Sequence, residues 1–223
     1  MGYLSVNLQV QDKPIIIVGG GSVAGRKAGA ILHAGARLTI ISPTITFELQ
    51  KLRDNGAISH VHREYRTGDI TGAFMVIAAT NRRDVNRALA EEAGRLGILA
   101  EITDAPAEGN VTSPAVFRQG DFSIAISTNN RAPALAARVR NEIADIFGPE
   151  YAKTVTIMGA VREKLLTDGN GSTYNKQVLR DLAEQLPLLI ASGAGTEIDA
   201  LLQRRLGPGY SLASLEPALE DPQ

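Results

Sequence analysis

The stretch IIIVGGGSVAGRK, residues 15–27, constrains the fold of this chain more than any other feature. An apolar, β-branched run ends at three consecutive glycines, and a segment with helical spacing of apolar residues begins at Ser22. Such a run is typical of a strand that is buried on both faces of a parallel sheet. Gly19, Gly21 and Ala24 then match the spacing G-x-G-x-x-G/A. The sequence therefore predicts a strand, a tight turn and a helix in direct succession.

Each small residue of this turn has its own physical reason. Gly19 permits the tight turn, Gly21 lets the backbone approach a diphosphate, and Ala24 lets the helix pack closely on the strand. The amides of Ser22, Val23 and Ala24 open the helix, whose positive dipole end attracts phosphates. We therefore predict that these five residues bind a dinucleotide. The alternative is a strand–helix turn that is tight for packing alone.

Strand-like and helix-like segments alternate through the first half of the chain. Further strands are expected at residues 38–41, 58–62, 74–79 and 98–102, and helices at residues 46–55 and 84–96. Repeated strand–helix–strand units are typical of a doubly wound parallel sheet. The sequence therefore predicts an α/β fold of the Rossmann type over residues 1–112.

The pattern changes after residue 112. Two short strands are expected around Gln119-Gly120, and a helix begins at Pro133, which suits a first helical turn. We expect a connecting segment at residues 113–147 and a small helical C-terminal domain at residues 148–223. Its helices are predicted at residues 150–166, 174–190 and 196–206, with a flexible TDGNGS sequence between the first two. The last stretch, GPGYSLASLEPALEDPQ, is predicted to be a loose tail.

Composition and charge argue against several classes of protein. A net charge of −1 gives no basic field for nucleic acid, and a chain without cysteine has no disulfide or thiolate metal site. The apolar runs are shorter than the roughly 20 residues that span a bilayer, and the first residues lack the features of a signal peptide. We expect a cytoplasmic protein that binds neither nucleic acid nor membrane. His60 and His62 share one side of a strand, but no third ligand is evident, so we predict no metal site.

The end of the second predicted strand lacks the usual ribose-binding acid. Ser42, Pro43 and Thr44 stand where such sheets carry a carboxylate for the ribose hydroxyls. No arginine or lysine for a 2′-phosphate occurs there either. NAD is therefore favoured over NADP, with the hydroxyls or amides of these three residues holding the ribose.

Two later strands also end in polar residues. Thr80, Asn81 and Asn86 carry hydroxyl and amide groups that can reach the nicotinamide half of a cofactor, although Thr80 or Asn81 would equally suit a helix N-cap. Asp104 ends the last strand, where a carboxylate can accept a proton from a substrate. The alternative is an aspartate that holds the turn before Pro106.

These stretches together resemble a known family. VGGGSVAGRKAGAILHAGARLTIISP, VIAATNRRDVN, ITDAP and SIAISTNNRAPALAARVR are similar, in order and spacing, to the precorrin-2 dehydrogenases, a module also found at the N-terminus of siroheme synthases. The resemblance covers about residues 1–147. It implies NAD-dependent oxidation of precorrin-2 to sirohydrochlorin in tetrapyrrole biosynthesis, and a homodimer held largely by the segment after the Rossmann domain. Some members also insert ferrous iron into sirohydrochlorin, and the resemblance leaves that activity open.

The resemblance also implies roles for single residues. Asp104 would be the base that accepts the proton released when the macrocycle loses a hydride. The loop before the helix at Pro133 would face the substrate, because a helix N-terminus favours anions. Its predicted substrate-binding residues are Ser127, Thr128, Asn129 and Arg131. Arg131 suits bidentate pairing with a tetrapyrrole carboxylate.

Two positions depart from the family pattern. Asn129 and Asn130 occupy a loop that is usually glycine-rich, although asparagine tolerates left-handed backbone angles. Glu101 stands where asparagine is common, and its charge would repel an anionic substrate unless it is paired or faces away. A different class of function also fits the residues: a regulatory module that senses NAD(H) and docks its helical tail on a partner. A sensor, however, needs no base at Asp104.

Overall fold

The computed structural model describes residues 2–167 and 176–219 and divides into two compact units, residues 1–113 and 114–223. The first unit alternates strands and helices as predicted. Its elements are β1 (Pro14–Val18), α1 (Ser22–His33), β2 (Arg37–Ile41), α2 (Phe47–Asp54), β3 (Ile58–Val61), β4 (Met75–Ala78), α3 (Arg83–Leu96), β5 (Leu99–Ile102) and the 3₁₀ helix η1 (Pro106–Glu108).

The five strands form one parallel sheet in the order β3-β2-β1-β4-β5. This order confirms the predicted doubly wound fold of the Rossmann type. Ile15 pairs with Leu38 on one side and with Met75 on the other, so β1 lies at the centre of the sheet. The chain reverses direction along the sheet between β1 and β4, and ligands of such sheets bind at this reversal, outside the carboxyl ends of the strands.

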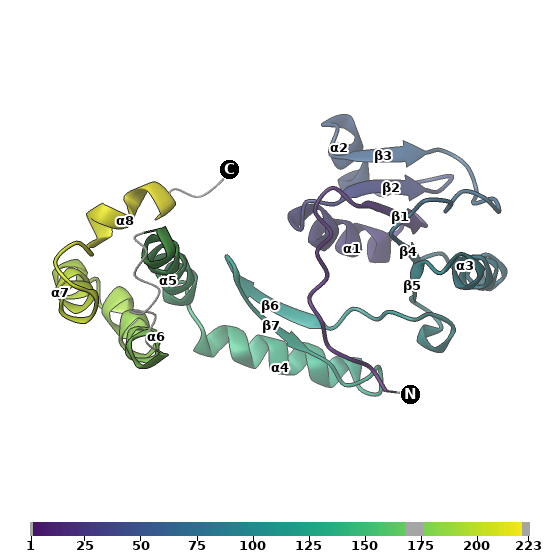
Figure 1. The fold of residues 1–223 in the computed structure, drawn as a ribbon. Coiled ribbons are helices and arrows are strands. Elements are labelled where there is room, and N and C mark those ends of the chain that lie inside the picture. The colour runs from purple at the N-terminus through teal and green to yellow at the C-terminus, as the bar shows by residue number, and fades with distance from the viewer. Residues whose placement is uncertain (1, 168–175, 220–223) are drawn as a thin grey trace. The chain divides into compact units, whose positions relative to one another are not determined.

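Both faces of the sheet are covered, which explains the continuous apolar runs in its strands. Helices α1 and α2 pack on one face and α3 packs on the other (Figure 1). Because successive strand residues point to opposite faces, neighbouring residues of one strand enter different cores. The first core includes Ile15, Ile17, Leu38, Ile40, Ala24, Ala28 and Leu49, and the second includes Val18, Ile41, Val76, Ala78, Leu89 and Ala93.

The second unit combines a β-hairpin with helices. The predicted strands around Gln119-Gly120 form the antiparallel pair β6 and β7, and α4 packs against both. The elements are β6 (Ala115–Gln119), β7 (Phe122–Ile126), α4 (Pro133–Ile146), α5 (Glu150–Thr167), α6 (Lys176–Ala191), α7 (Gly195–Leu206) and α8 (Leu212–Leu219). The predicted start of the second tail helix at residues 174–175, and residues 168–172 of the TDGNGS stretch, lie outside the described residues.

The prediction of a loose C-terminal tail is wrong for residues 212–219, which form α8. The backbone amide of Ser214 donates to the Ser211 hydroxyl at 3.2 Å, and the Leu212 amide donates to Asp199 Oδ1 at 2.7 Å. Leu215 is buried in the helical core, which joins α8 to α5. Capping and one buried contact therefore order a segment whose glycines and prolines indicated a loop.

Across the parts of the chain that the structure describes, no helix combines the length and the apolar character that crossing a membrane requires.

Candidate functional site

The first two glycines of the turn after β1 are required by the fold itself. Gly19 has a φ of 118°, and a Cβ there would collide with the Ala79 carbonyl. A Cβ on Gly20 would collide with the Thr44 carbonyl, and the Gly20 carbonyl accepts a hydrogen bond from the Thr46 amide at 3.0 Å. Sequence reasoning gave no role to Gly20, whose one signal was being the middle glycine of three.

Gly21 is different, because no protein atom occupies the space beside it. A Cβ at Gly21 would meet nothing within 4 Å, although the residue caps α1 with extended backbone. The start of α1 has no side-chain cap hydrogen bond and no acidic residue in its first turn. Free amides and the positive end of a helix dipole therefore face an opening that a side chain would fill. This arrangement fits the diphosphate of a dinucleotide.

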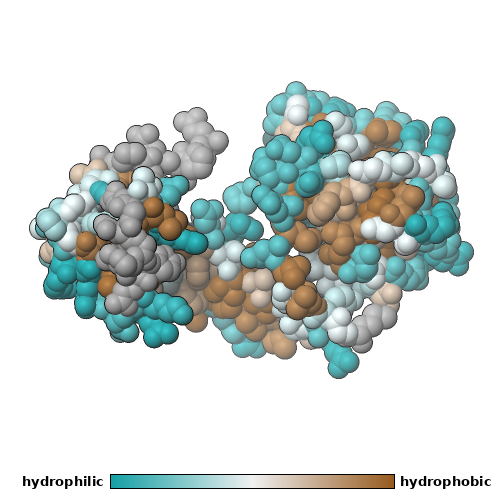
Figure 2. Space-filling model, in the orientation of Figure 1, coloured by the Kyte–Doolittle hydropathy of each residue, from teal (hydrophilic) through white to brown (hydrophobic). Residues whose placement is uncertain are grey.

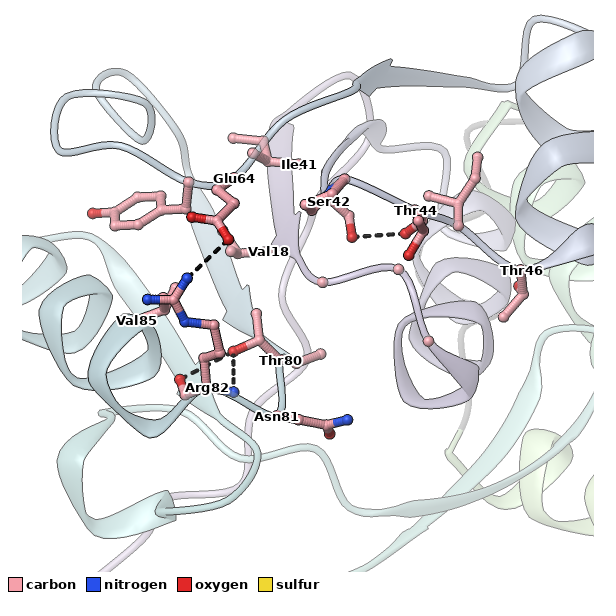
Figure 3. A pocket seen from close by; sticks show the side chains of 17 residues that line it. Val18, Ile41, Ser42, Thr44, Thr46, Glu64, Thr80, Asn81, Arg82 and Val85 are labelled. Carbon is pink, nitrogen blue, oxygen red and sulfur yellow. Dashed lines mark hydrogen bonds and ion pairs between the residues drawn. The ribbon is translucent and has the colours of Figure 1, made fainter.

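A pocket of about 440 Å³ lies in front of this turn. The carboxyl ends of β1, β2 and β4 line it, together with the loop after β3 (Figure 3). The predicted cofactor-binding residues that line it are Gly19, Gly21, Ser42, Pro43, Thr44, Thr80 and Asn81. Four others do not: Ser22 and Val23 lie in the first turn of α1, Ala24 is buried under the helix, and Asn86 is buried in α3.

Asn86 supports the pocket from behind. Its side chain is fully buried, and its Nδ2 donates to the Thr80 carbonyl at 3.0 Å. The Thr80 hydroxyl donates to Asn86 Oδ1 at 2.7 Å and accepts from the Arg82 amide at 3.1 Å. The turn after β4 is therefore fixed from within, and Asn81 is the exposed member of the predicted trio.

At the end of β2, the Ser42 hydroxyl donates to the Thr44 carbonyl at 2.7 Å. Ser42 is almost fully buried, and its carbonyl lies 2.9 Å from His60 Nε2. His60 also contacts the ring of His62. Within the described residues, no group of three or more His, Asp or Glu side chains could hold a metal ion.

The pocket lining also includes residues that the sequence analysis did not select, among them Glu64, Tyr65, Arg82 and Val85. Arg82 Nη1 lies 2.8 Å from Glu64 Oε1. The Tyr65 hydroxyl donates to the buried carboxylate of Glu92, and burial together with this hydrogen bond raises the pKa of Tyr65 above its ordinary value. Glu64 and Tyr65 follow β3, and Arg82 and Val85 lie at the start of α3, so no single sequence motif contains these four residues.

Asp104 lies in the turn after β5, outside the pocket lining. Its side chain is 36% exposed, and its Oδ2 lies 3.9 Å from Arg83 Nε. Arg83 also pairs with Glu108 of η1. The preceding Thr103 hydroxyl donates to the Ala78 carbonyl at 2.8 Å, which fastens this turn to the end of β4. Asp104 is thus an accessible carboxylate at the same sheet edge as the glycine turn.

Glu101, three residues earlier, is paired and nearly buried. Its Oε1 lies 2.6 Å from Lys27 Nζ of α1, and its two carboxylate oxygens accept hydrogen bonds from the amide and hydroxyl of Ser113. The side chain is 9% exposed. The charge is therefore neutralised inside the first unit, and its expected repulsion of an anionic substrate does not apply.

The loop predicted to face the substrate belongs to the second unit. Asn129 and Asn130 have φ values of 51° and 60°, so asparagine holds the left-handed angles that glycine commonly takes. The Thr128 hydroxyl accepts the Ala132 amide at 3.1 Å, and the Ser127 hydroxyl accepts the Asn129 amide at 3.1 Å. Arg131 is exposed beside the start of α4, which has no acidic residue in its first turn.

Two family models match consecutive parts of the chain. A model described as putative NAD(P)-binding matches residues 6–115, and one described as sirohaem biosynthesis protein central matches residues 119–146. The first covers the sheet unit and its pocket. The second covers β7, α4 and the loop between them.

Curated relatives match over most of this chain. Siroheme synthase 1 of Aeromonas salmonicida (strain A449) is 34% identical over 165 residues, which cover 74% of this chain and 35% of that protein. Siroheme synthase of Pseudomonas paraeruginosa (strain DSM 24068 / PA7) is 29% identical over 222 residues, covering 95% of this chain and 46% of that protein. The chain thus spans less than half the length of these relatives.

A solved structure has a similar fold. The structure of SirC, precorrin-2 dehydrogenase, matches with a TM-score of 0.63 and 23% identity, and the match covers 98% of each chain.

Proposed function

This chain belongs to the precorrin-2 dehydrogenase and siroheme synthase family, and we propose that it oxidises precorrin-2 to sirohydrochlorin with NAD as the hydride acceptor. The observation that carries the proposal is the uncapped start of α1 beside the open space at Gly21. That feature fits a dinucleotide diphosphate, and an accessible carboxylate, Asp104, stands at the same edge of the sheet.

Oxidation of precorrin-2 removes one hydride and one proton from the macrocycle. NAD, when bound, accepts the hydride. We assign the proton to Asp104, because its partly exposed carboxylate follows β5 at the edge where such sheets bind ligands. Thr80 and Asn81 are proposed to contact the nicotinamide half, with Asn86 holding Thr80 in place through its two hydrogen bonds.

We assign recognition of the tetrapyrrole carboxylates to the loop before α4. Ser127, Thr128, Asn129 and Arg131 surround a helix start that lacks acidic residues. Arg131 is exposed, and its guanidinium suits a bidentate contact with a carboxylate. Left-handed Asn129 and Asn130 give this loop its tight shape.

The chain is further proposed to form a homodimer through the second unit. Apolar residues gather over β6, β7 and α4 on the face shown in Figure 2. Val116, Leu135 and Ile146 are 38%, 52% and 67% exposed. Exposed apolar patches of this kind are typical of protein interfaces. Light scattering that gives the mass of a single chain at micromolar concentration would contradict the dimer.

The direct test is a spectrum recorded with the full chain, precorrin-2 and NAD. We expect the absorbance of sirohydrochlorin and that of NADH to rise together, with no change when NAD is left out. Turnover absent under conditions where NAD binds would overturn the proposed reaction and favour an NAD(H)-sensing module. A separate sample with sirohydrochlorin and ferrous iron, without NAD, tests whether the chain also inserts iron.

A further inference from the structure

Charged side chains are scarce in the nucleotide pocket. Of the described residues that line it, only Glu64 and Arg82 carry a charge (Figure 3). Ser42, Pro43 and Thr44 at the end of β2 supply none. NAD and NADP differ by a 2′-phosphate. Any difference in affinity that arises from charged side chains of this pocket must therefore come from Glu64 and Arg82.

Each of the three side-chain nitrogens of Arg82 already donates to a carboxylate oxygen. Its Nη1 donates to Glu64 Oε1 at 2.8 Å, and its Nη2 donates to Asp84 Oδ2 at 2.7 Å. Its Nε points to the second oxygen of Asp84 at 3.4 Å. Two carboxylates therefore share one guanidinium, which leaves this group of three side chains with a net charge of about −1 at neutral pH. While Glu64 holds Arg82, the positive charge that would attract a phosphate is already offset by two carboxylates.

The loop after β3 holds the backbone of Glu64 from both sides. On one side, Arg63 pairs with Asp69 through two hydrogen bonds of 2.6 and 2.8 Å, which lower the pKa of Asp69, and Arg63 also donates to the Glu64 carbonyl. On the other side, the Tyr65 hydroxyl is anchored to Glu92. Glu64 therefore keeps a defined place at the pocket wall, although its own side chain is 64% exposed.

We propose that Glu64 sets the preference for NAD over NADP, in place of the acid that the end of β2 lacks. This inference rests on the proposed nucleotide site. The carboxylate acts in two ways: it repels a 2′-phosphate, and it occupies the one arginine in the pocket lining that could bind that phosphate. Discrimination by a repulsive group is an ordinary route to specificity, because it weakens the wrong ligand more than it strengthens the right one.

The test is calorimetric titration of the full chain with NAD and, separately, with NADP. In Glu64→Gln, the side chain keeps its shape and loses its charge, so that of the two carboxylates only Asp84 still offsets Arg82. We expect the Kd for NADP to fall about tenfold, with a smaller change for NAD. The matched control is Glu91→Gln, which neutralises an equally exposed carboxylate, also paired with an arginine, outside the pocket. It should leave the ratio of the two Kd values unchanged.

A second variant separates the two actions of Glu64. Adding Arg82→Gln to Glu64→Gln removes the cation whose charge the first change leaves less compensated, so part of the gain in NADP affinity should be lost. An unchanged ratio of Kd values in Glu64→Gln would overturn the inference and leave the proposed function standing. Equal changes in Glu64→Gln and Glu91→Gln would also overturn it. If the unsubstituted chain bound neither nucleotide, both the inference and the proposed function would fail.

Discussion

The turns after β1 and β5 lie at the same edge of one parallel sheet, yet they are built in opposite ways. Three glycines form the first, and α1 begins there without a side-chain cap or an acidic residue. The second carries Asp104, with Arg83 beside it. One turn offers backbone amides and the other a titratable side chain. Nucleotide binding and proton transfer should therefore respond to separate substitutions.

The largest effect is expected from Asp104→Asn. The amide keeps the size of the side chain but cannot accept a proton, so turnover should fall about 1000-fold, within the usual range for loss of a general base. Affinity for NAD should change less than about twofold, because Asp104 lies outside the pocket lining. Stopped-flow absorbance gives the rate, and calorimetry gives the affinity.

Asp54→Asn is the matched control for that experiment. Asp54 is also exposed and lies 2.8 Å from an arginine, but it is at the end of α2. The Asp54→Asn variant should turn over precorrin-2 at the same rate as the unsubstituted chain. A turnover of Asp104→Asn within tenfold of that of the unsubstituted chain would mean that another group accepts the proton. The proposed division of binding and proton transfer between the two turns would then be wrong.

Glu101→Ala tests the connection between the two regions. Lys27 of α1 and Glu101 of β5 pair at 2.6 Å, so one ion pair joins the helix after the glycine turn to the strand that leads to Asp104. Its removal leaves a largely buried ammonium and the Ser113 donors without their acceptor. We expect the free energy of unfolding to fall by about 2–3 kcal/mol, measured by urea denaturation.

Two further variants make the loss from Glu101→Ala interpretable. Glu91→Ala removes an exposed carboxylate from α3 and should cost less than about 0.5 kcal/mol. Adding Lys27→Met to Glu101→Ala removes the orphaned charge and should restore part of the stability. A loss below about 1 kcal/mol in Glu101→Ala would mean that the pair does not hold the two regions together.

Sequence reasoning succeeded where the physical cause is local. The β-branched run at residues 15–18 and the spacing of Gly19, Gly21 and Ala24 are set by burial and turn geometry within one short segment. They predicted the parallel sheet and its glycine turn. The same local logic predicted the hairpin around Gln119-Gly120.

Features that depend on contacts between residues far apart in the sequence were not predicted. The need for Gly20 comes from the Thr44 carbonyl, and α8 depends on Asp199 and a buried contact with α5. Glu64 reaches the pocket only because a loop folds across the sheet edge, so the sequence showed it as one charge among several. Asn86 was predicted to touch the cofactor, and its complete burial could not be read from helical spacing.

The smallest effect is expected from Gly21→Ala, and it tests the first turn alone. A methyl group at Gly21 meets no protein atom within 4 Å, so stability should change by less than about 1 kcal/mol. The same methyl group enters the space assigned to the diphosphate, and we expect NAD to bind about tenfold more weakly. Calorimetry and urea denaturation measure the two quantities.

Gly29→Ala provides the comparison, because it adds the same methyl group to the same helix, also into open space, but outside the pocket lining. It should raise stability slightly through helix propensity and leave NAD affinity unchanged. Equal affinities in both variants would show that the opening at Gly21 is not where the diphosphate lies. A loss of affinity in Gly21→Ala alone, with turnover intact at saturating NAD, would instead assign binding to the first turn and leave the chemistry to the second.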